Sequence, residues 1–152
     1  MIGLGSFQQR KEPPIIRPTT PAANVATPTD ANALLLQRLE GGVMLALGVV
    51  VYAWLGQSWV VFAVLFLAPD LAMFGYLRST ATGTLTYNLV HTYVAPALLA
   101  LPGLAVGPMA FGLAAIWTAH IGADRLLGYG LKLSSGFNQT HLGPIGKARR
   151  GH

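Results

Sequence analysis

The chain has 152 residues, of which 53% are hydrophobic and only 10% are charged. Its formal net charge of +5 comes from basic residues that form no amphipathic face with interleaved aromatics, which argues against a nucleic-acid partner. The absence of cysteine excludes disulfides, thiolate metal sites and cysteine nucleophiles.

Two long windows of the sequence contain no Asp, Glu, Lys or Arg. One lies between Glu40 and Asp70, and the other lies between Arg78 and Asp124. With its flanking residues, each window is long enough to cross a hydrocarbon core of about 30 Å twice as a helix. A soluble domain would need a charged face on nearly every helix. The sequence therefore predicts an all-α, four-transmembrane-helix bundle.

The first predicted element is an extended, Pro-rich arm, residues 1–33. It holds five prolines, Pro13, Pro14, Pro18, Pro21 and Pro28. Such a segment cannot bury enough apolar surface to form its own core. We therefore expect the arm to dock on other membrane protein subunits.

The transmembrane domain is predicted over residues 34–127. Its four helices are expected at about 34–55, 59–77, 84–101 and 109–127. Pro69 and Pro96 should break the second and third helices locally, because proline lacks a backbone N–H. The Gly-rich remainder, residues 128–152, has too little apolar content to span again and is expected to be a cytoplasmic interfacial tail.

All ten basic residues fall on one side of the membrane in this topology. They are Arg10, Lys11, Arg17, Arg38, Arg78, Arg125, Lys132, Lys147, Arg149 and Arg150. The turns on the opposite side, residues 56–58 and 102–108, carry no charge. Because cytoplasmic loops are rich in Lys and Arg, both termini are predicted to be cytoplasmic.

The polar residues inside the predicted helices share one depth, near the cytoplasmic side. Counted at about 1.5 Å per residue, this level holds Asp70, Asn88, His91, His120 and Asp124. The spacing of Asn88 and His91, and of His120 and Asp124, places each pair on one helix face. Intramembrane ionisable groups almost always face the bundle interior. We therefore expect these five residues to form one intramembrane polar cluster.

Two chemical interpretations of this cluster stay open. Two imidazoles with carboxylates suit a divalent metal (Zn, Fe or Mn), which would make Asp70, His91, His120 and Asp124 candidate ligands. Alternatively, the same side chains form a metal-free network of interhelical hydrogen bonds, worth about 1 kcal/mol each. Glu40, which precedes Gly41 and Gly42, is assigned to helix packing.

The glycines after helix four permit sharp turns and a close backbone approach. If the tail folds back under the bundle, its contributors to the cluster are expected among Arg125, Tyr129, Lys132, Thr140 and His141. Alternatively, the tail lies at the interface and Lys132 contacts lipid phosphate.

Several segments resemble a family of small bacterial integral membrane proteins known only as a domain of unknown function. They are residues 36–41 (LQRLEG), 67–76 (LAPDLAMFGY), 87–93 (YNLVHTY), 119–132 (AHIGADRLLGYGLK), 136–137 (GF) and 140–143 (THLG). The resemblance covers about 34–146 and implies the four-helix fold and a location in the bacterial inner membrane. It implies no established activity.

A second resemblance is to bacterial inner-membrane metal-dependent hydrolases. Their His-x3-Asp pair on a late helix, followed by Gly, is similar to His120, Asp124 and Gly128. The His-Ser pair of that family's earlier motif is His91-Thr92 here. This likeness is an analogy of fold and does not transfer function.

Two functions therefore remain. Small size, a compact bundle and the arm favour an accessory or structural subunit of a larger membrane complex. The alternative is a metal-dependent hydrolase-like enzyme acting on a lipid or phosphate substrate at the cytoplasmic leaflet. A transporter is disfavoured, because four short helices without an internal repeat give little room for alternating access.

Overall fold

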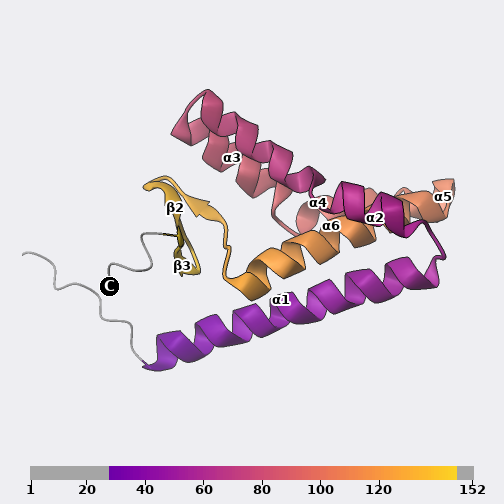
Figure 1. Cartoon of the computed structure of the whole chain (residues 1–152), viewed down its shortest axis with the longest axis horizontal. Coiled ribbons are helices and arrows are strands. Elements are labelled where there is room, and N and C mark those ends of the chain that lie inside the picture. The colour runs from indigo at the N-terminus through magenta and orange to yellow at the C-terminus, as the bar shows by residue number, and fades with distance from the viewer. Residues whose placement is uncertain (1–27, 147–152) are drawn as a thin grey trace, which may run out of the picture.

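The computed structural model describes residues 28–146, which are built mainly from helices (Figure 1). In chain order these are α1 (Pro28–Trp54), α2 (Trp59–Phe66), the 3-10 helix η1 (Ala68–Leu77), α3 (Thr80–Val90), α4 (Val94–Ala100), α5 (Gly103–Val106) and α6 (Pro108–Leu127). Three short strands follow, β1 (Lys132–Leu133), β2 (Gly136–Thr140) and β3 (Gly143–Pro144). The predicted mainly helical fold is confirmed.

Two helical stretches are long and apolar enough to cross a membrane, Ala31–Trp54 and Trp59–Leu77. The pair Thr80–Val90 and Val94–Ala105 qualifies jointly, as one span or a re-entrant loop bent by 46°. The described residues therefore hold two or three candidate spans. The fourth predicted span, α6, is not among them, because His120, Asp124 and Arg125 lower its mean hydropathy.

The long helix α1 begins at Pro28, earlier than the predicted start at Leu34. Proline fits the first turn of a helix, where its missing N–H would have no partner anyway. The last residues of the predicted arm are therefore helical. Residues 1–27 lie outside the described residues, so the docking of the arm stays a prediction.

Proline also determines where the third predicted helix breaks. The break falls at residues 91–93, before Pro96, and the segment after it begins α4. A proline ring displaces the carbonyl four residues earlier, which here belongs to Thr92. The Thr92 carbonyl instead accepts the N–H of Ala95 at 3.2 Å. As a result, His91 lies at the C-terminal cap of α3.

Helices α1 and α6 lie side by side through small residues (Figure 1). A Cβ added at Gly48 of α1 would lie 2.6 Å from the carbonyl oxygen of Ala115 in α6. One added at Gly122 of α6 would lie 2.7 Å from the carbonyl oxygen of Gly41. Such close approach is typical of membrane helix pairs, which associate through small residues. The α6 helix is the most buried one, because its neighbours cover Ile116, Ala119 and Ile121 fully or almost fully.

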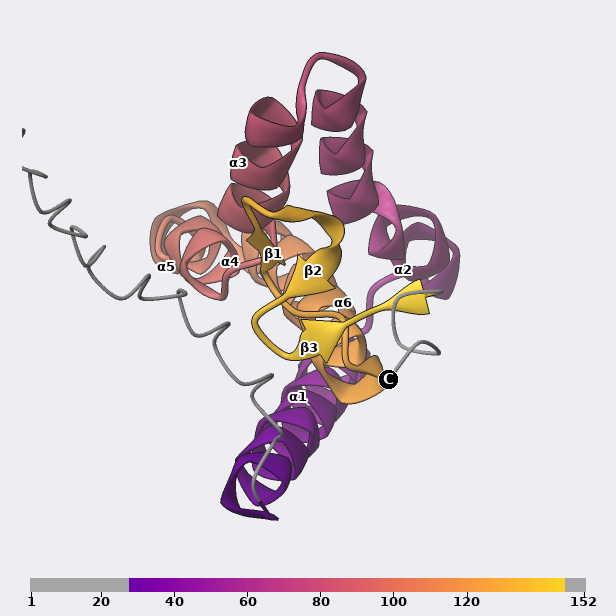
Figure 2. The ribbon, with the colours of Figure 1, turned by 90° about the vertical axis from the view of Figure 1, so that its left-hand side faces the viewer.

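The two ends of the molecule differ in what they hold. The start of α1, the loop between η1 and α3, and the strands lie at one end, whereas the α1–α2 turn and α5 lie at the other (Figure 1). Figure 2 looks onto the first end and shows the sheet in front of α6, with α1 and α3 on opposite sides. Of the basic residues within 28–146, Arg78 lies in the loop between η1 and α3 and Lys132 in β1, both at the first end.

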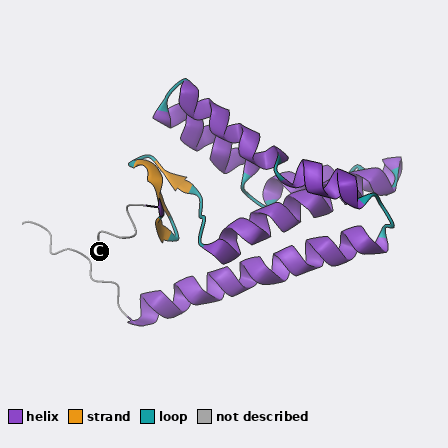
Figure 3. Ribbon diagram, in the orientation of Figure 1, coloured by secondary structure: helices purple, strands orange, loops and turns teal. Residues whose placement is uncertain are grey.

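The tail contains a small antiparallel sheet with the order β1-β2-β3, which the sequence did not predict (Figure 3). Two of its strands are only two residues long. Such short strands carry no readable alternation of apolar and polar residues. The sheet packs against α3 through β1 and β2, so contacts distant in sequence hold it in place.

Candidate metal centre

Four ionisable side chains converge inside the helical domain. Asp70 lies in the first turn of η1, His91 caps α3, and His120 and Asp124 lie one turn apart on α6. One ligand-capable atom from each side chain lies within 4.8 Å of the other three. We call these four residues the His/Asp cluster. The structure thus brings together all four candidate metal ligands.

The spacing of the four atoms is close to that of a metal site. The Nε2 atoms of His91 and His120 are 3.2 Å apart. Asp70 Oδ1 lies 3.5 and 3.6 Å from these two nitrogens, and Asp124 Oδ2 lies 3.6 and 3.9 Å from them. Four ligands at about 2.0–2.1 Å from a tetrahedral zinc ion lie about 3.3–3.4 Å apart. The cluster therefore fits a four-coordinate site with two nitrogen and two oxygen ligands.

Tyr87 orients two members of the cluster. Its carbonyl lies 2.9 Å from His91 Nδ1. Because a carbonyl can only accept, Nδ1 carries the proton and the lone pair of Nε2 is free to bind. The Tyr87 hydroxyl donates to Asp124 Oδ2 at 3.0 Å, and its ring stacks on His91 with centroids 3.6 Å apart. Metal-ligating histidines are usually fixed by such partners.

Burial differs between the imidazoles and the carboxylates. His91 and His120 are each 2% exposed, whereas the side chains of Asp70 and Asp124 are 37% and 19% exposed. His120 Nδ1 is buried and has no hydrogen-bond partner within residues 28–146. Two carboxylates this close repel unless a proton or a cation lies between them. The two carboxylates therefore favour a bound cation. Asp70, the most exposed of the four residues, lies on the open side of the cluster.

Asn88 does not join the cluster, contrary to expectation. Its amide donates to the Lys132 carbonyl at 2.9 Å and accepts the Lys132 N–H at 2.7 Å. The expected position rested on the i, i+3 spacing from His91 alone. Both polar atoms of the Asn88 amide are occupied by the backbone of Lys132. Asn88 instead attaches the tail to α3.

The tail folds back onto the helices, which was one of the two interpretations of the sequence. Lys132 is 4% exposed, and its Nζ donates to the Phe137 carbonyl at 3.0 Å. The same nitrogen lies 4.0 Å from the Phe137 ring centroid and 5.1 Å from that of Tyr87. Burial lowers the pKa of Lys132. Lys132 therefore adjoins the cluster through Tyr87 without entering it.

Three other predicted tail contributors, Arg125, His141 and Tyr129, differ in their contacts. Arg125 donates from Nη2 to the His91 carbonyl at 3.2 Å, and its guanidinium lies 3.0 Å from His141 Nε2. His141 Nδ1 accepts the Leu131 N–H at 2.8 Å. Burial, and then the charge of Arg125, lower the pKa of His141. Tyr129 is 44% exposed and stays at the surface.

Tyr87 belongs to the site, although it is not among the expected residues. Its signal was present, because Tyr87 precedes His91 by one helical turn and so lies on the same face. Glu40 lies away from the cluster, in a pocket that it shares with Tyr93 and Arg125. Its neighbour Gly41 packs against the Arg125 side chain, as expected for a packing glycine.

Comparison with known families agrees with the resemblance noted from the motifs. The family described as "Domain of unknown function (DUF4260)" matches residues 34–145. The chain belongs to this family. The matched range contains the whole His/Asp cluster together with Tyr87, Arg125 and Lys132. No curated protein and no solved structure matches the chain.

Proposed function

We propose that the His/Asp cluster binds a divalent metal and that the protein is a metal-dependent hydrolase acting on a phosphate-bearing or lipid substrate at the cytoplasmic leaflet. The observation that carries this proposal is the spacing of its two imidazole nitrogens and two carboxylate oxygens, 3.2–3.9 Å for the five pairs given above. Zinc, iron and manganese all accept such a mixed set of ligands.

The surroundings of the cluster support hydrolysis. A divalent metal polarises a phosphoryl oxygen and supplies a nucleophile from water at neutral pH. The partly exposed side chain of Asp70 leaves one side of the cluster open at the surface of the chain, where a substrate can approach. Arg125 and Lys132 bring positive charge to the neighbourhood, which suits a substrate that carries phosphate.

An accessory or structural subunit is the second candidate function. Only 11% of the apolar window in α1 is buried within the chain, which leaves most of this helix free for lipid or a neighbouring protein. In that case the cluster is a metal-free polar network that fixes helix packing. For both functions we place the protein in the bacterial inner membrane with cytoplasmic termini, a placement supported by the one-sided basic residues.

Metal analysis of the purified full-length chain separates the two candidates. After loading with Zn²⁺, Mn²⁺ or Fe²⁺ and removal of free metal, we expect about one tightly bound ion per chain. The His120→Gln and Asp124→Asn variants should lose it. The matched control His141→Gln should retain it, because His141 contacts Arg125 and Leu131 and lies outside the ligand set. Equal metal content in wild type and His120→Gln would contradict the metal centre.

Activity is tested after reconstitution into vesicles that contain phosphate esters. We expect the metal-loaded wild type to release product and Asp124→Asn to lose that release. A chain that binds metal but hydrolyses none of the phosphomonoesters or phosphodiesters would contradict the hydrolase role. It would favour a structural metal in an accessory subunit.

A further inference from the structure

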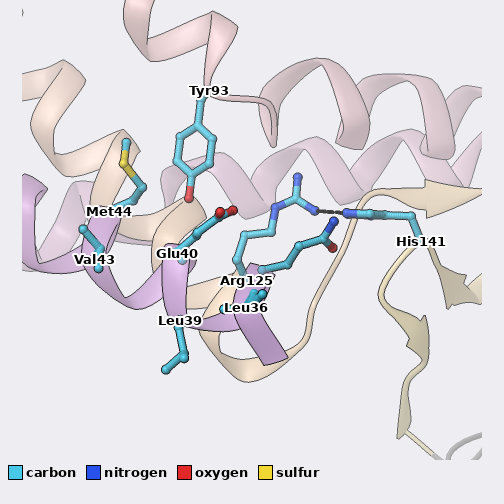
Figure 4. A pocket seen from close by; sticks show the side chains of 10 residues that line it. Leu36, Leu39, Glu40, Val43, Met44, Tyr93, Arg125 and His141 are labelled. Carbon is cyan, nitrogen blue, oxygen red and sulfur yellow. Dashed lines mark hydrogen bonds between the residues drawn. The ribbon is translucent and has the colours of Figure 1, made fainter. Parts of the chain in front are cut away.

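A second site lies beside α1, in a pocket of about 600 Å³ (Figure 4). The outer face of α1 forms its apolar wall through Leu36, Leu39 and Val43. Its polar side consists of Gln37 and Glu40 from the same helix, Tyr93 from the break between α3 and α4, Arg125 from α6 and His141 from the tail. Its lining residues in α1 fall within 36–44, mostly in the half of this helix that begins at the end of the molecule holding the sheet (Figure 1).

The two charged residues of this pocket have opposite signs and are not paired with each other. Within residues 28–146, the Glu40 carboxylate has no ion-pair partner within 4.0 Å. Arg125 instead contacts the His91 carbonyl and the His141 ring. A ligand with one charge would satisfy Glu40 or Arg125 and leave the other uncompensated. A ligand with both charges complements the pocket.

The Tyr93 hydroxyl is a further unsatisfied group in this pocket. It is buried and has no hydrogen-bond partner among the described residues. Figure 4 shows that it points toward the same space as the Glu40 carboxylate. The oxygen has almost no accessible surface, so a ligand reaches it only when the Tyr93 side chain turns. Because a buried hydroxyl without a partner is costly, such a turn toward a polar ligand group is favoured.

The apolar wall distinguishes a lipid from a soluble metabolite. Leu36, Leu39 and Val43 recur at helical spacing along one face and are 61%, 53% and 58% exposed. Leu36 and Leu39 precede Glu40 in the sequence, and Val43 follows it by one turn toward the middle of a helix long and apolar enough to span the membrane. An acyl chain lying along this stripe would extend directly from a headgroup held by the polar side.

We infer that this pocket binds the headgroup of an amine-bearing zwitterionic phospholipid, such as phosphatidylethanolamine. Glu40 accepts hydrogen bonds from its ammonium group, and Arg125 donates to its phosphate. One acyl chain lies against Leu39 and Val43. Binding at this pocket does not require the metal. Since Arg125 also donates to the His91 carbonyl, the bound headgroup lies one side chain away from the His/Asp cluster.

Native mass spectrometry of the full-length chain with equal amounts of phosphatidylethanolamine and phosphatidylglycerol tests this inference. We expect about tenfold more of the ethanolamine adduct, because the glycerol headgroup offers Glu40 no cation. Glu40→Gln should bring the ratio of the two adducts close to one, and Arg125→Gln should weaken both. The matched control Arg78→Gln removes an exposed charge from the loop between η1 and α3 and should leave the ratio unchanged.

Equal adducts in the wild type, or an unchanged ratio in Glu40→Gln, would overturn the inference. A competition between two soluble ligands tests the apolar wall: glycerophosphoethanolamine, which has the headgroup but no acyl chains, and a short-chain phosphatidylethanolamine. If both displace the bound lipid equally well, the apolar wall contributes nothing and the inference is overturned. The His120→Gln variant separates this inference from the metal proposal. It should lose metal and keep the lipid ratio.

Discussion

At the scale of single residues, Tyr87 is the residue on which most of the site depends. Its carbonyl fixes the tautomer of His91, its hydroxyl binds Asp124, and its ring lies between His91 and the ammonium group of Lys132. Tyr87 is 1% exposed, so these contacts are made in an environment that water hardly reaches. Its hydroxyl therefore acts on the cluster without being a ligand.

Replacing Tyr87 by Phe tests this role. The variant keeps the ring and the backbone carbonyl and removes only the donor to Asp124. We expect metal affinity to fall by about 10–100-fold, as when other partners of metal ligands are lost, while the helices stay folded. Competition with a chelator measures the change. Tyr76→Phe is the matched control, since the Tyr76 hydroxyl contacts Thr84 away from the cluster; an equal loss there would contradict a specific role for Tyr87.

Counting helical depth was sufficient to propose a common level for Asp70, His91, His120 and Asp124, and the structure brings these side chains together. The same reasoning failed for Asn88, because the backbone of Lys132 occupies its amide. Which side chains meet across helices depends on helix rotation and on such contacts between distant residues. Neither can be deduced from the local sequence.

At the scale of elements, the contact between α1 and α6 depends on glycine at particular positions. Gly48→Ala should lower the free energy of unfolding by about 1–3 kcal/mol, as overpacking does elsewhere. The added methyl group would collide with the Ala115 carbonyl. Gly42→Ala is the matched control, because its methyl group would meet only the flexible end of Leu126, at 3.3 Å. Reversible unfolding in mixed micelles measures both, and equal losses would contradict this packing.

The attachment of the tail should depend on pH through His141. The pKa of His141 is lowered by burial and by Arg125, and Glu40 lies in the same pocket. Because the folded state disfavours the protonated ring, attachment is fully stabilised above the ordinary histidine pKa of about 6.5 and weakens as the pH falls below it. Protonation also removes the acceptor of the Leu131 N–H.

Hydrogen exchange of residues 130–141, corrected for the intrinsic effect of pH, measures this weakening. We expect faster exchange at pH 5.5 than at pH 7.5 in the wild type and a smaller difference in His141→Gln. A pH effect of the same size in both proteins would show that another group is responsible.

The sheet itself could not be predicted from the sequence, because contacts such as that between Asn88 and Lys132 join residues far apart in sequence.

At the scale of the whole molecule, the structure separates the uncharged turns from the strands and the start of α1 (Figure 1). The positive-inside rule then predicts the orientation in the membrane. The chain contains no cysteine, so a single introduced cysteine is the only thiol that a labelling reagent can modify. Ser58→Cys and Ala105→Cys should react with an impermeant thiol reagent in intact cells, and Ser135→Cys only after lysis. The reverse pattern would invert the topology.

The central claim is that the His/Asp cluster holds a metal, and X-ray absorption spectroscopy of the zinc-loaded chain tests it most directly. The account predicts four nearest ligands at about 2.0–2.1 Å, with the scattering signature of two imidazoles. His120→Gln should lose one imidazole or the metal itself, while His141→Gln should leave the spectrum unchanged. A zinc ion surrounded only by oxygen ligands, or a spectrum that His120→Gln does not alter, would contradict the account.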